Sequence, residues 1–132
     1  MFLCYINNMD CIFCDIVKNK NNIIAENDLA VAFYDSFPVS DGHALVIPKR
    51  HVETYFDLNE AEIAAIFELS QEIKRVIDDK FHPTGYNVGF NVGRDGGQTV
   101  MHCHLHIIPR YLGDIENPRG GIRNIIKSKT KY

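Results

Sequence analysis

QTVMHCHLHIIPR, residues 98–110, is the stretch that decides the fold. In it His102, His104 and His106 alternate with apolar residues, and the run ends in Ile107 and Ile108. This period of two predicts a β-strand. A rise of about 3.3 Å per residue would place successive histidines roughly 6.7 Å apart on one face, with the intervening apolar side chains facing a core.

Three aligned imidazoles have three explanations. Neutral imidazole is a common zinc ligand, so the strand can carry a metal site. Alternatively, one imidazole attacks a substrate while its neighbours orient it and exchange protons. The third explanation is a solvated strand face without function, which we disfavour because three of the six histidines fall within five residues.

A Cys-x-x-Cys spacing joins Cys11 and Cys14. The pair can form half of a zinc site, a redox dithiol, or two buried apolar residues. A redox role favours a βαβ context, which the polar run after the pair and the antiparallel pattern that follows do not provide. The zinc and buried-residue interpretations both stay open at this point.

The composition is that of one ordinary globular domain of 132 residues, 45% hydrophobic and 23% charged. A net charge of -3 gives no reason to expect sequence-independent binding to nucleic acid or to a membrane. The opening residues lack the pattern of a signal peptide, and no apolar run reaches 18 residues. We therefore expect a cytoplasmic protein with reduced thiols.

The remaining periodicities predict an α+β fold: a mainly antiparallel five-stranded sheet, one long helix and a short N-terminal helix. Asn59, followed three residues later by Glu62, predicts the cap of the long helix, and Asp10 that of the short one. Strands are expected at residues 23–26, 30–34, 43–48 and 85–92, besides the histidine strand.

A glycine-rich loop, residues 93–99, leads directly into the histidines. Glycines allow backbone N–H groups to converge on an anion, and Gln98 and Thr99 add neutral donors. Such loops join many hairpins, so the prediction of an anion site depends on the histidines that follow.

The run HCHLHII, residues 102–108, resembles the motif that defines the histidine triad family of nucleotide hydrolases and transferases. The resemblance extends over residues 11–111 and includes CIFCDIV, AVAFYD, GHALVIPKRH and NVGRDGGQTV. It implies a histidine-triad-like catalytic domain over residues 11–111, preceded by an extension, 1–10, and followed by a tail, 112–132. It also implies a homodimer formed through the long helix and the strand at 85–92.

The resemblance assigns site residues as well. It makes His104 the nucleophile of a nucleotidyl-histidine intermediate, with His43, His102 and His106 completing the catalytic group. It places Asp35 on the ribose hydroxyls. It implies phosphate contacts from Asn91, Gln98 and Thr99, base contacts from Phe13, Ile16, Phe33 and Phe37, and a structural zinc held by Cys11, Cys14, His51 and His102.

We therefore expect a purine-nucleotide hydrolase or nucleotidyl transferase that cleaves at the α-phosphorus of a phosphoramidate or a dinucleoside polyphosphate. Two alternatives remain. One is a zinc hydrolase with its metal on the three triad histidines, and the other is a non-catalytic nucleotide-binding regulatory or adaptor protein.

Overall fold

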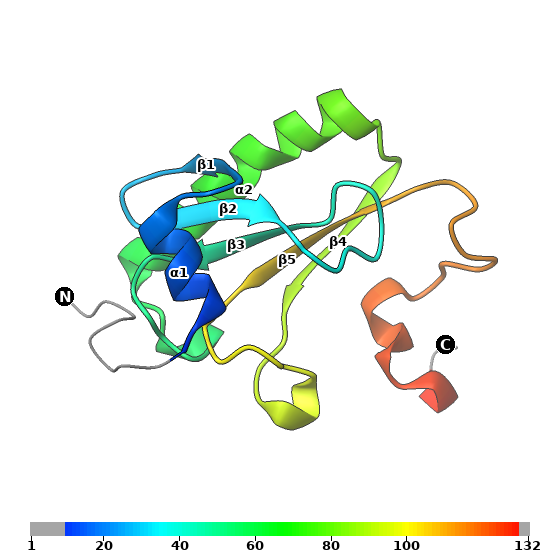
Figure 1. Ribbon diagram of the computed structural model, residues 1–132. Coiled ribbons are helices and arrows are strands. Elements are labelled where there is room, and N and C mark those ends of the chain that lie inside the picture. Colours follow the sequence, from blue (N-terminus) through cyan, green and yellow to red (C-terminus); the bar gives the residue numbers. More distant parts are fainter. Residues whose placement is uncertain (1–9, 130–132) are drawn as a thin grey trace.

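The computed structural model describes residues 10–129; residues 1–9 of the predicted extension and the last three residues of the predicted tail lie outside this range. A five-stranded sheet has the order β1-β2-β3-β5-β4, and every neighbouring pair is antiparallel (Figure 1). The predicted α+β fold is therefore confirmed. The elements are α1 (Ile12–Asn19), β1 (Ile23–Glu26), β2 (Ala30–Tyr34), β3 (Ala44–Pro48), α2 (Glu60–Phe81), β4 (Gly85–Phe90) and β5 (Leu105–Arg110), with 3-10 turns at Tyr55–Asp57, Arg94–Gly96, Gly121–Ile125 and Lys127–Lys129.

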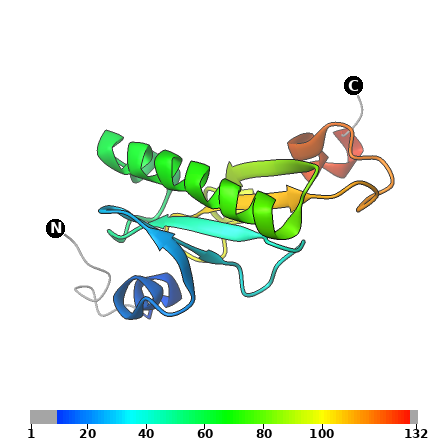
Figure 2. The ribbon, with the colours of Figure 1, turned by 90° about the horizontal axis from the view of Figure 1, so that it is seen from above.

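The two faces of the sheet are covered by different helices, with α2 on one side and α1 on the other (Figure 2). Strand residues alternate between the faces, as the pleat requires. Those beneath α2 are small or aliphatic: Ala30, Ala32, Ala44, Val46, Leu105 and Ile107. Those toward α1 include Val31, Phe33, Leu45 and Ile47, packed with Phe13 and the two cysteines. The same alternation places His104 and His106 on the α1 side.

The long helix begins as the sequence predicts. Asn59 accepts a hydrogen bond from the Glu62 N–H, and the Glu62 carboxylate accepts one from the Asn59 N–H. The Glu62 carboxylate is buried and also receives two N–H groups of Arg50, at 2.9 and 2.7 Å. The beginning of α2 is thus held against the chain just after β3.

Several details differ from the sequence prediction. Strand β3 begins at Ala44 rather than at residue 43, and β4 ends at Phe90 rather than at residue 92. Strand β5 begins at Leu105, so His102 and His104 lie in the segment leading into it rather than within the strand. The N-cap of α1 is Cys11 rather than Asp10, because the Cys11 sulfur accepts the Cys14 N–H. None of the helices among residues 10–129 is long and apolar enough to span a bilayer.

Candidate active site and metal centre

Two cysteines and two histidines from distant segments meet beside α1; we call Cys11, Cys14, His51 and His102 the cysteine–histidine cluster. Their four ligand atoms lie within 4.8 Å of one another. The His102 Nδ1 is 3.5 Å from each sulfur, and the His51 Nδ1 is 3.3 Å from the Cys14 sulfur. Bond lengths of about 2.3 Å to sulfur and 2.0–2.1 Å to nitrogen around a tetrahedral zinc imply an S···N separation of roughly 3.5 Å. The four residues therefore fit the predicted zinc.

The protonation of His102 also suits a ligand. Its Nε2 lies 2.8 Å from the Pro48 carbonyl, which only accepts, so the ring proton is on Nε2 and the Nδ1 lone pair faces the sulfurs. Burial lowers the pKa of His102 to about 4, so the ring is neutral. Cys11 and Cys103 are free thiols, as expected, whereas Cys14 takes part in a disulfide. Because a disulfide sulfur is not a thiolate, the metal-bound form requires reduced Cys14.

The central histidine of the triad is held in one tautomer. Its Nδ1 lies 2.8 Å from the carbonyl oxygen of His102, so this nitrogen carries the proton and donates it. The lone pair is therefore on Nε2. His104 is only 6% exposed, and its ring packs edge-on against Phe13 with centroids 5.0 Å apart. A buried, oriented imidazole with one available lone pair suits nucleophilic attack.

Asp35, His43 and His106 form a second group, the carboxylate–histidine cluster. The His43 Nδ1 accepts the backbone N–H of Val39 at 3.1 Å, so the proton of the neutral His43 ring is on Nε2. That Nε2 lies 3.0 Å from the His106 Nδ1 and 3.5 Å from the Asp35 carboxylate. His106 thus accepts at Nδ1 and carries its own proton on Nε2. The His104 and His106 ring centroids are 4.9 Å apart.

Burial keeps both histidines of this cluster neutral. It is the largest cause that lowers the pKa of His43, against the opposing effect of Asp35. Burial, followed by the charges that His104 and His43 would carry, lowers the pKa of His106 to about 4. The cluster therefore offers neutral N–H donors at physiological pH.

The glycine-rich loop is arranged differently from the sequence prediction. The N–H groups of Gly96, Gly97 and Gln98 donate within the loop, so they do not converge on an anion. The buried Gln98 side chain accepts the Gly93 N–H and donates to the carbonyls of Glu53 and Val100. Gln98 therefore shapes the loop. The side chains of the other two predicted phosphate contacts, Asn91 and Thr99, are exposed at its ends.

The four predicted base contacts separate into three environments. Ile16 and Phe33 line a hollow beside α1. Phe13 is buried, with its ring 5.4 Å from that of Phe33 and 5.0 Å from that of His104, so it packs against the central triad histidine. The Phe37 side chain is 88% exposed, and the Phe37 backbone N–H donates to the Asp35 carboxylate.

Two backbone groups that fix the tautomers have no signal in the sequence. The Val39 N–H acts on His43, and the Pro48 carbonyl acts on His102. Every residue type except proline offers the same N–H, and every residue offers the same carbonyl, so only the fold could reveal these contacts.

Comparison with known proteins identifies the family of the chain. The model of the HIT domain family matches residues 17–113, a range that includes the three triad histidines and excludes Cys11 and Cys14. The adenosine 5'-monophosphoramidase of Schizosaccharomyces pombe is 43% identical over 104 residues, 77% of this chain and 75% of that protein. The AP-4-A phosphorylase of Mycobacterium tuberculosis is 37% identical over 93 residues, 70% of this chain but 48% of that protein.

A solved structure extends the comparison to the metal. The crystal structure of a Zn-bound histidine triad family protein from Mycobacterium smegmatis is 36% identical, has a TM-score of 0.73, and is matched over 80% of this chain and 78% of that one. Fold, triad and sequence agree, and this chain belongs to the histidine triad family.

Proposed function

We propose that this protein cleaves nucleoside 5'-phosphate derivatives at the α-phosphorus through a covalent nucleotidyl-histidine on His104. The observation that carries the proposal is the hydrogen bond from the His104 Nδ1 to the His102 carbonyl, because it leaves the Nε2 lone pair as the reactive atom. Relatives named as a phosphoramidase and an AP-4-A phosphorylase support nucleotide chemistry in general. The substrate we propose is a phosphoramidate or a dinucleoside polyphosphate.

The reaction has two steps at one phosphorus atom. In the first, the His104 Nε2 forms an N–P bond as the bond from phosphorus to the leaving group breaks. In the second, water attacks phosphorus as the N–P bond breaks; the proton of that water passes to the monophosphate product or to solvent, and His104 regains its Nε2 lone pair. The neutral His106 N–H, supported by His43, is the donor that the cluster offers to the leaving group or to the phosphoryl oxygens.

Nucleotide binding is assigned to groups around these histidines. The Asp35 carboxylate, at the end of β2, suits the paired hydroxyls of a ribose because it accepts two hydrogen bonds. Asn91 and Thr99 are the side chains left to contact the phosphate, since Gln98 is committed to the loop.

The cysteine–histidine cluster is proposed to hold a structural zinc. Cys11, Cys14, His51 and His102 would supply two thiolates and two imidazoles. Four protein ligands leave no open position, so the ion would fasten α1 to the segment that enters β5 and would not contact substrate.

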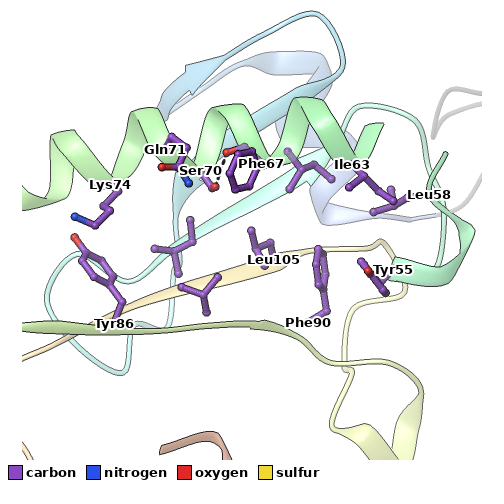
Figure 3. A pocket seen from close by; sticks show the side chains of 13 residues that line it. Tyr55, Leu58, Ile63, Phe67, Ser70, Gln71, Lys74, Tyr86, Phe90 and Leu105 are labelled. Atoms are coloured by element: carbon purple, nitrogen blue, oxygen red, sulfur yellow. Dashed lines mark hydrogen bonds between the residues drawn. The ribbon is translucent and has the colours of Figure 1, made fainter. Parts of the chain in front are cut away.

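We also propose that the protein is a homodimer. An apolar groove of about 380 Å³ runs between α2 and β4, and its walls include Ile63 and Phe67 from the helix and Val88 and Phe90 from the strand (Figure 3). Phe67 is 62% exposed and Val88 46%. Among the described residues β4 pairs only with β5, so its outer edge can pair with the same edge of a second copy. Light scattering should give a dimer mass that Phe67→Glu reduces to the monomer; a monomeric wild type at micromolar concentration contradicts the dimer.

The function is tested by following hydrolysis of adenosine 5'-phosphoramidate and a diadenosine polyphosphate with the wild type and with His104→Ala. We expect turnover of at least one substrate and a loss of roughly 10⁴-fold or more in the variant, as for removal of a covalent nucleophile. Calorimetric binding of AMP to His104→Ala is the control for folding. Turnover that survives in His104→Ala contradicts the mechanism, and AMP binding without any turnover favours the regulatory or adaptor function.

A further inference from the structure

A hollow of about 260 Å³ lies where α1, the turn after it and the end of β2 meet. Figure 1 shows α1 beside β2 in this region. The hollow lies outside the two histidine clusters, and neither catalysis nor metal binding uses its polar residues. It is lined by Asp15, Ile16, Asn19, Asn21, Asn22, Phe33, Tyr34 and Ser36.

The hollow is connected to the nucleophile along two paths. Phe33 in its wall contacts Phe13, which contacts the His104 ring. Asp35, the proposed ribose ligand, lies in the sequence between the wall residues Tyr34 and Ser36. Its carboxylate is 3.5 Å from the His43 Nε2. The proposed nucleophile His104, the proposed ribose ligand Asp35 and the hollow therefore lie in the order of the phosphate, ribose and base of a nucleoside 5'-phosphate.

The hollow combines an apolar wall with a polar rim. Ile16 and Phe33 supply the apolar surface that a base can contact. The rim carries the side-chain amides of Asn19, Asn21 and Asn22, all exposed. Within residues 10–129 no side-chain hydrogen bond occupies these three amides.

The turn between α1 and β1 gathers the three amides. Lys20 and Asn22 both have positive φ, 55° and 60°, so the chain reverses sharply after α1. Asparagine tolerates this conformation better than most residues do. The Lys20 ammonium interacts with Glu26 at 3.4 Å, and Lys20 does not line the hollow. The rim therefore contains amides and the Asp15 carboxylate, without a cation.

Resting on the proposed function, we propose that Asn19, Asn21 and Asn22, with Asp15, recognise the polar edge of the nucleobase and select an amino-purine. An amide presents a donor beside an acceptor, and each outer edge of adenine presents the complementary pair, the N6 amino group beside N7 or N1. A carboxylate only accepts, so Asp15 favours an amino group over a carbonyl at that position. Adenine is thus preferred to hypoxanthine, which has an oxygen in place of the amino group.

The test compares kcat/KM for adenosine and inosine 5'-phosphoramidates. We expect the wild type to prefer adenosine, and Asn19→Ala, Asn21→Ala and Asn22→Gly each to reduce the preference by about 2- to 10-fold, the effect of one neutral hydrogen bond. Glycine is used at 22 because the φ there is 60°. Asn124→Ala, an amide in the C-terminal segment, should leave the preference unchanged.

Two further measurements decide between explanations. Ribose 5-phosphoramidate, which has no base, should be cleaved equally by the wild type and the rim variants; an equal loss with this substrate would show damage to the chemistry and overturn the proposal. If no nucleotide is hydrolysed, calorimetry with AMP and IMP still applies. Preference for AMP that the rim variants lose supports the rim although the hydrolase function has failed. Equal binding, or a preference that the variants retain, overturns the rim.

Discussion

The cysteine–histidine cluster and the carboxylate–histidine cluster satisfy the same distance criterion for a metal site, since the ligand atoms of each lie within 4.8 Å of one another. They differ in where the histidine proton sits. In the first, the His102 Nε2–H donates a hydrogen bond to the Pro48 carbonyl, and the Nδ1 lone pair faces the sulfurs. In the second, the Val39 N–H occupies the His43 Nδ1, so the nitrogen that faces His106 and Asp35 carries a proton.

Proximity of ligands therefore does not by itself make a metal site. A nitrogen that carries a proton has no lone pair for a cation, and in the second cluster its N–H is directed to a neighbouring imidazole. The backbone acceptor in the first cluster and the backbone donor in the second therefore favour the first cluster as the site of the proposed zinc.

The largest expected effect comes from breaking the first cluster. In Cys11→Ser, purified under reducing conditions, zinc should fall from one equivalent per chain to none, and Tm by roughly 10 °C or more, because the metal contributes directly to folding. Elemental analysis and thermal unfolding measure the two quantities. Cys103→Ala, which removes the free thiol outside both clusters, should keep its zinc. One equivalent of zinc in Cys11→Ser would instead favour a metal on the triad histidines.

Breaking the second cluster should separate activity from metal content. His43→Ala removes the N–H that supports His106, and we expect kcat/KM to fall about 10²-fold, the lower range for a positioned acid or base group. Its zinc content should stay at one equivalent. His82→Gly is the matched control, since His82 is an exposed histidine with φ 56° at the end of α2. Loss of zinc from His43→Ala would show that this cluster also binds the metal.

Much of the fold can be predicted from the sequence, because alternation and capping are local. Alternation with a period of two residues predicts the five strands and the side of the histidine segment that faces the core. The pair Asn59 and Glu62, three residues apart, predicts the beginning of α2. The exact width of the buried stripe of α2 is less predictable: Ile77 is fully buried, whereas its neighbour Val76, at the margin of the stripe, is 39% exposed.

The site is only partly predictable, because much of it consists of long-range contacts. Sequence motifs indicate which histidines and cysteines share a site. They do not show that the Gln98 side-chain amide donates both of its hydrogen bonds to the carbonyls of Glu53 and Val100. Nor do they show that the asparagines at the end of α1 and in the turn after it line part of a hollow, since a polar run of that kind usually marks a solvated turn.

The buried imidazole of His106 makes the stability of the fold depend on pH. The pKa of His106 is lowered to about 4 by burial, from an unfolded value near 6.5, so the unfolded chain binds its proton first. Stability should therefore decline as the pH falls from about 6.5 toward 4, by on the order of 2 kcal/mol from this residue. Urea unfolding at several pH values should show a shallower decline for His106→Gln than for the wild type. Parallel curves for the two proteins would mean that His106 does not resist protonation.

The smallest expected effect comes from removing the backbone N–H that fixes the tautomer of His43 and so makes the second cluster differ from the first. Val39 is 72% exposed, and Val39→Pro deletes its N–H without introducing a charge. His43 can then carry its proton on Nδ1, which releases the Nε2 lone pair toward His106 and Asp35. We expect kcat/KM to fall less than about tenfold, the range for one neutral hydrogen bond. Zinc added beyond the first equivalent should inhibit this variant at lower concentrations than it inhibits the wild type or Val39→Ala, which keeps the N–H. Equal zinc sensitivity of all three proteins would mean that the tautomer of His43 is fixed by something other than Val39.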